Sequence, residues 1–177
     1  LETGESNSNS GNILVKGGNA GSKGSSIEMF SGNSVSSTGG AFFVGSGSSK
    51  QGFSGAIDIL TGKGQMSGSI RMISGESAEE SGTINIGTGN SVSSSAGSIL
   101  LQAGTSKANG GNVVVSAGGS STATGGVVIV RSGKSEIGVG GSMDLQTDHS
   151  AHSGSINMGT GSSFSSNSGS IIMSVGN

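Results

Sequence analysis

The feature that most constrains the fold is a short phrase that recurs along the whole chain. It reads Gly, small residue, apolar, any residue, apolar, any residue, small residue, Gly, and a Ser/Gly/Asn-rich stretch joins it to the next copy. The first apolar residue of each copy serves as a marker, and the markers are Ile13, Ile27, Phe42, Ile57, Ile70, Ile84, Ile99, Val113, Val128, Met143, Ile156 and Ile171. Successive markers lie 13 to 15 residues apart. Twelve phrases at so regular a spacing are an internal repeat.

A second apolar side chain follows each marker after two residues. These residues are Val15, Met29, Val44, Ile59, Met72, Ile86, Leu101, Val115, Val130, Leu145, Met158 and Met173. A period of two is the period of a strand, and the Ile and Val content suits a pleated surface. The absence of Pro also suits a chain of strands and tight turns.

The connections between phrases are about seven residues long, too long for two-residue hairpins. Similar phrases joined by similar connections can stack in register. We therefore predict an all-β fold, a parallel β-solenoid (β-helix) of about twelve 13–15-residue repeats that forms a single domain over residues 1–177. Two repeats per coil would give two facing parallel sheets. One repeat per coil and an antiparallel sandwich remain as alternatives. The first residue is Leu1, so we expect the chain to be a segment of a longer protein or filament.

Gly and Ser dominate the connections. Gly ends nearly every phrase, where positive φ or a close backbone approach is expected, and Asp148 takes that place once. Ser occurs so often that we assign it no particular role.

The residue between the two inward positions should face outward. It is apolar in four of the six odd-numbered phrases, and the acidic examples fall on even-numbered ones. Exposed apolar side chains often mark interfaces. We therefore predict lateral self-association through Leu14, Phe43, Leu100 and Ile129.

Composition argues against several functions. A net charge of −2 leaves no basic surface for nucleic acid, and no apolar run reaches the length of a membrane span. Cys is absent, and Asp148, His149 and His152 form the one His cluster, which we interpret as a solvated turn. We expect no catalytic residues, no metal and no cofactor, and hence no enzyme.

The phrase at Gly68–Gly75, Gly97–Gly104 and Gly154–Gly161 resembles the Gly/Ser-rich β-solenoid repeats of cell-surface and extracellular fibre proteins, such as secreted proteins of diatoms, oomycetes and algae, and adhesins. The resemblance implies an extracellular or cell-surface location and a structural role as a fibre or adhesin segment, a rigid rod that self-associates. Other cell-surface or matrix components are further expected partners. The alternative hypothesis is a ligand-binding solenoid with an ice-binding or polysaccharide-binding surface.

Overall fold

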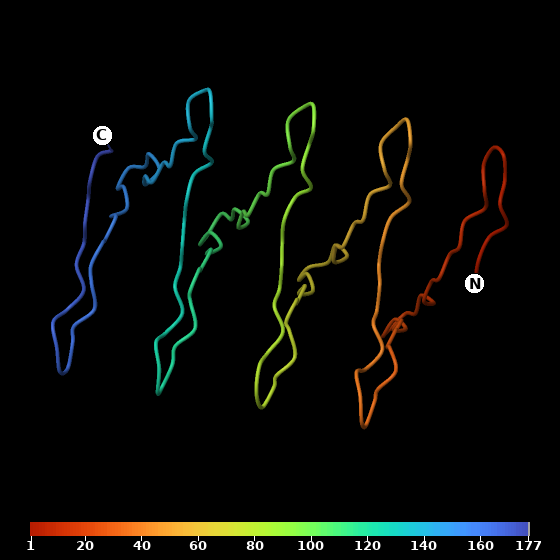
Figure 1. Cartoon of the computed structure of the whole chain (residues 1–177). Helices are drawn as coiled ribbons and strands as arrows, with labels where there is room; N and C mark the ends of the chain where they lie inside the picture. The colour runs from red at the N-terminus through yellow and green to blue at the C-terminus, as the bar shows by residue number, and fades with distance from the viewer. Residues whose placement is uncertain (177) are drawn as a thin grey trace. The chain divides into compact units, whose positions relative to one another are not determined.

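The computed structural model describes residues 1–176, and among them it contains neither a helix nor a strand. The chain doubles back at narrow loops that lie where the connections join the phrases (Figure 1). We number these loops 1 to 12 in chain order. They span residues 3–11, 17–25, 31–40, 46–55, 61–68, 74–82, 88–97, 103–111, 117–126, 132–141, 147–154 and 160–169.

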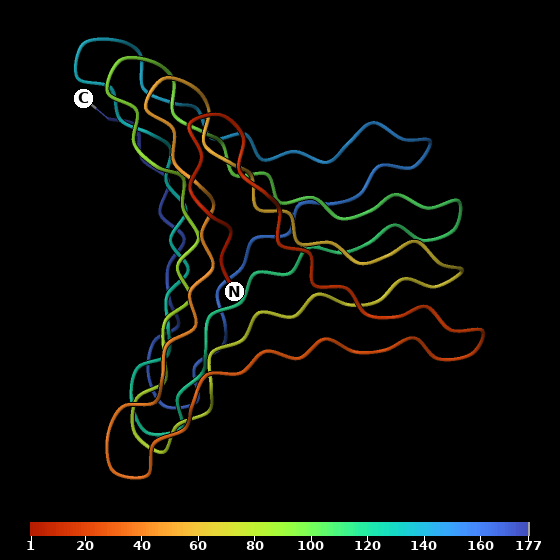
Figure 2. The same ribbon diagram turned by 90° about the vertical axis from the view of Figure 1, so that its right-hand side faces the viewer.

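Every loop contains one bend near its middle. The bends lie at residues 7–8, 21–22, 35–37, 50–52, 64–66, 78–79, 92–94, 107–109, 121–123, 136–138, 151–152 and 164–166. The two limbs of a loop can be followed as paired traces in Figure 2. The sequence repeat is therefore a repeat of loops.

The chain divides into two compact units, Leu1–Asn85 and Ile86–Asn177. Loops 1 to 6 belong to the first unit and loops 7 to 12 to the second. In each unit a backbone hydrogen bond closes the second, third and fourth loop. The donor amide and acceptor carbonyl pairs are Ser25–Gly18, Gly40–Gly32 and Gly55–Gly47 in the first unit, and Gly111–Gly104, Gly126–Gly118 and Gly141–Gly133 in the second. The two units are thus built alike. The expectation of a single domain stays a prediction.

The predicted parallel β-solenoid is wrong. A sheet needs a continuous ladder of hydrogen bonds between extended segments. Over residues 1–176 the backbone forms the six bonds above, one at each closed loop, and no ladder continues from them. Neither the facing sheets nor the coils of two repeats are present in this part of the chain.

The solenoid core is also missing, because no residue between 1 and 176 is buried. Ordering a Gly-rich chain carries a large entropy cost. Burial of apolar side chains would have to offset that cost, and the described residues bury none.

The alternation of the phrase survives as a difference in exposure. The twelve marker side chains are the least exposed of the large apolar residues, from 46% at Ile156 to 60% at Val113. The residue after the marker is generally more exposed, as at Phe43 with 91%. The second inward position is not consistently sheltered, since Val130 at 70% is more exposed than Ile129 at 65%. The difference in exposure therefore belongs to the markers.

Candidate functional site

The recurring structural feature is the neck of each loop, the pair formed by its first and last residues. In eleven loops the first residue is Thr, Ser or Ala and the last is Gly. A Cβ built on that Gly would lie between 3.1 Å (at Gly111, facing Ala103) and 3.7 Å (at Gly154 and Gly169) from the facing side chain. The necks therefore bring two chain segments into van der Waals contact where one partner has no side chain.

Loop 2 reverses this arrangement. Its last residue is Ser25, in the place that Gly holds in the other loops, and its first residue is Gly17. A Cβ on Gly17 would lie 2.7 Å from the Ser25 hydroxyl oxygen, which is too close. In loop 2 the side chain of the neck is therefore on the last residue, and a second one on Gly17 would require the Ser25 hydroxyl to turn away.

The necks are also the most enclosed part of the chain. Five residues within 1–176 are half-buried and the rest are exposed; all five open a loop, and they are Gly17, Ser31, Thr61, Ser74 and Ala103.

The role predicted for the phrase-ending Gly needs correction. No Gly among residues 1–176 has a positive φ. A Cβ built on Gly32 or Gly104 would meet nothing within 4 Å, so no steric need for Gly is present at these two positions. Their carbonyls accept the bonds that close the loops. The close approach belongs to the Gly that opens the next phrase.

A serine hydroxyl supports the bend in ten loops. In each, Ser stands two residues after the residue that ends the phrase, and its hydroxyl oxygen accepts the amide two or three residues further on. The donor-to-acceptor distances run from 2.8 Å at Gly138 to 3.4 Å at Gln51 and His152. The serines are Ser6, Ser34, Ser49, Ser77, Ser91, Ser106, Ser120, Ser135, Ser150 and Ser163. Ser is suited to turns because it can satisfy a backbone amide locally.

Sequence reasoning missed these bend serines because it treated Ser as uniform. The signal is positional, since Ser recurs at one distance from the end of the phrase while Ser elsewhere in the loops varies. Two loops depart from it, with Ala20 in loop 2 and Gly64 in loop 5. At Gly64 a built Cβ would lie 2.9 Å from the Met66 carbonyl oxygen, so this bend leaves no room for a side chain.

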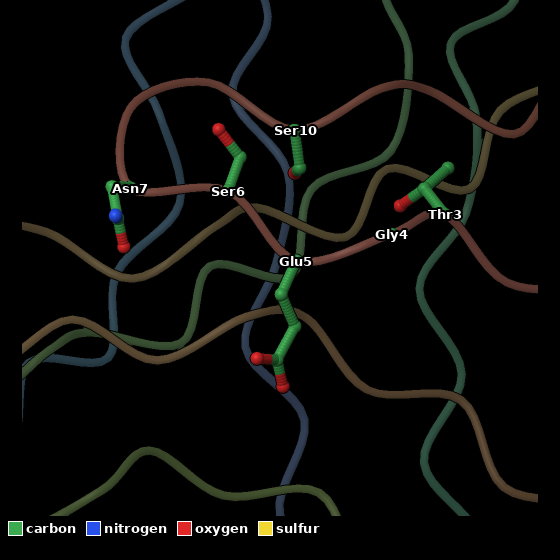
Figure 3. A pocket seen from close by; sticks show the side chains of 6 residues that line it. All are labelled: Thr3, Gly4, Glu5, Ser6, Asn7 and Ser10. Carbon is green, nitrogen blue, oxygen red and sulfur yellow. The ribbon is translucent and has the colours of Figure 1, made fainter.

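Two open hollows lie at loops. One is lined by Thr3, Gly4, Glu5, Ser6, Asn7 and Ser10 of loop 1, and Figure 3 shows the Glu5 carboxylate projecting away from the loop. The other is lined by Gln146, Thr147, Asp148, His149 and Ser153 around loop 11. All of these side chains are exposed. The hollows are therefore open to solvent and define no ligand.

The His cluster belongs to loop 11. The Asp148 carboxylate accepts the His149 backbone amide at 2.7 Å, and the Ser150 hydroxyl donates to the His152 carbonyl at 3.0 Å. Both contacts serve the turn. Within residues 1–176 no group of three or more His, Cys, Asp or Glu side chains is placed to hold a metal ion.

The four residues predicted for lateral association are exposed. Leu14 is 83% exposed, Phe43 91%, Leu100 81% and Ile129 65%. The first two lie in the first unit and the other two in the second. Their role stays a prediction.

Comparison of the chain with protein-family models, curated proteins and solved structures found no match. In the described part of the chain, no helix has the length and apolar character needed to cross a bilayer.

Proposed function

We propose that this chain is a structural repeat segment of an extracellular or cell-surface protein, and that it works by associating with further copies of itself through the apolar side chains of its phrases. The observation that carries the proposal is the exposure of these side chains. No residue within 1–176 is buried, and all twelve markers are about half exposed or more.

Exposed apolar surface is unfavourable in water, and covering it is the main driving force of most protein association. Burying one aliphatic side chain stabilises by about 1.5 to 3 kcal/mol. A chain with twelve such phrases gains this burial free energy at each phrase that a second copy covers. The net charge of −2 adds little repulsion between copies.

Sedimentation of the purified chain over a wide concentration range, with electron microscopy of the same samples, tests the proposal. We expect the mean mass to rise with concentration and to fall on cooling, because hydrophobic association weakens in the cold. A monomer at every concentration and temperature would refute self-association.

The lateral residues are tested by the variant F43K/L100K, which we expect to dissolve the assemblies. The matched control is V35K/V92K, which adds the same two charges at fully exposed apolar positions in loops 3 and 7. Equal loss of assembly in both variants would show that added charge, and not the predicted positions, is responsible.

A further inference from the structure

We propose that copies of this chain associate with a stagger of one unit, so that the first unit of one chain covers the second unit of another. This inference rests on the proposed self-association and adds its register. It starts from the likeness of the two units.

Loops 2 to 5 of the first unit match loops 8 to 11 of the second at a constant offset of 86 residues, and the outer loops deviate by one residue. Ile13 aligns with Ile99, and the neck of loop 3 at Gly40 aligns with that of loop 9 at Gly126. Loops 2 to 5 have the same order of lengths as loops 8 to 11, and the hydrogen-bonded loops occupy the same places in both units. The chain is therefore a tandem pair of six-loop units.

The residues predicted for lateral association follow this offset. Leu14 aligns with Leu100, and Phe43 aligns with Ile129. Each unit thus carries two large apolar residues at the same two aligned positions. The two positions are equally far apart along the sequence in both units, so a second unit can match a first unit in register.

The charged residues favour pairing of unlike units over pairing of like units. When a unit pairs in parallel register with the same unit of another copy, each charged residue faces its own copy, and like charges disfavour that pairing. Residues 11–81 contain ten charged residues: Lys16, Lys23, Glu28, Lys50, Asp58, Lys63, Arg71, Glu76, Glu79 and Glu80.

Pairing of the first unit with the second removes nearly all of this repulsion. Of the ten residues, only Asp58 then faces a like charge, at Asp144. Lys50 faces the opposite charge of Glu136, which already lies 3.4 Å from Lys134 in its own loop. The others face neutral residues such as Gln102 and Val114.

A contact between two different surfaces forms an open assembly unless rotation closes it into a ring. Each chain offers one first unit and one second unit to other copies. The partner that covers the apolar pair of one unit is therefore the other unit of a neighbouring copy.

Complementation of two defective variants tests the register. The variant L14K/F43K disables the first unit and L100K/I129K disables the second. At low ionic strength we expect each variant alone to be monomeric, and an equimolar mixture to form a one-to-one dimer that grows no further. V35K/V92K should assemble like the unchanged chain, and the amide spectra of the loop necks check that each variant keeps its loops.

Other outcomes overturn the inference in distinguishable ways. If each variant alone forms a homodimer, like units pair with like and the stagger is wrong while self-association stands. If both variants assemble like the unchanged chain, the apolar pairs are not the contact. If the unchanged chain never assembles, the proposed function fails and the stagger with it.

A charge exchange gives an independent reading. K50E places two acidic residues opposite each other, and we expect the association constant to fall severalfold at low salt. Adding E136K should restore it, while unchanged association in K50E would contradict the pairing of Lys50 with Glu136.

Discussion

Ser120 and Ser121 are neighbours in loop 9, but only the Ser120 hydroxyl supports the bend. It accepts the amides of Thr122 at 3.3 Å and Ala123 at 2.9 Å. The contribution of a serine in this chain is therefore decided by its position relative to the end of the phrase.

We expect S120A to speed hydrogen exchange of the Ala123 amide. A typical intramolecular hydrogen bond contributes about 0.5 to 1.5 kcal/mol, which corresponds to a roughly two- to tenfold change in rate. S121A is the matched control and should leave this amide unchanged. Equal effects of the two substitutions would contradict the assigned role of Ser120.

The neck of loop 9 gives a second test at single residues. A Cβ on Gly126 would lie 3.3 Å from the Ala117 Cβ, whereas Gly119 has nothing within 4 Å. Replacing a Gly by Ala where the backbone allows it stabilises by about 0.4 to 1 kcal/mol through the unfolded state. We expect G119A to stabilise the loop by this amount. In G126A, crowding at the neck should cancel the stabilisation.

Exchange of the amide at position 126, which donates to the Gly118 carbonyl at 2.8 Å, measures the effect. G126A should accelerate it severalfold. The double variant A117G/G126A should restore the rate in part, because the new Cβ would also lie 3.3 Å from the Gly118 backbone nitrogen. No restoration by A117G would show that the Ala117 side chain does not contribute to the crowding.

At the scale of the loop, the two shortest loops solve the same turn differently. Loop 11 uses Ser150, whose hydroxyl accepts the His152 amide at 3.4 Å, while loop 5 has Gly64 in that place and brings it close to the Met66 carbonyl. Two loops of the same length therefore form different bends: a serine hydroxyl supports the bend of loop 11, and a close backbone contact forms that of loop 5.

We expect G64A to deform loop 5, because its Cβ would lie 2.9 Å from a backbone oxygen that cannot swing away like a side chain. Relieving the contact by bending backbone angles costs about 1 kcal/mol or more. Amide chemical shifts of residues 64–66 should move, while S150A in loop 11 should move chiefly that of His152. Unchanged shifts in loop 5 would refute the crowding.

For the whole molecule, protection from exchange should be sparse. In dilute solution, where copies are separate, we expect slowed exchange at the six amides that close loops 2, 3, 4, 8, 9 and 10. Circular dichroism should lack a strand signature. Protection at alternate residues along whole phrases would reveal a ladder and contradict the structure.

The spacing of the loops was predictable from the sequence, but their construction was not. The markers from Ile13 to Ile171 recur once between successive loops, and they are less exposed than the other large apolar residues. A period of two states only which side chains share a side of an extended segment. Whether a neighbouring segment completes a ladder depends on contacts between distant residues, which periodicity does not contain.

Only part of the candidate site could be predicted from the sequence. Leu14, Phe43, Leu100 and Ile129 stay predicted lateral residues, because inward positions such as Val130 are exposed as well. The necks and bend serines were overlooked because Ser and Gly are so common that their positions matter more than their numbers. Aligning the phrases by their last residue reveals both.

Gly17 and Ser25 show that a loop can carry the side chain of its neck on the last residue instead of the first. In the other loops a Cβ on the last Gly would lie 3.1 to 3.7 Å from the facing side chain, a range that runs from crowding at Gly111 to ordinary contact at Gly154 and Gly169. Tolerance of a second side chain at the neck should therefore differ from loop to loop, lowest in loop 8 and highest in loops 11 and 12.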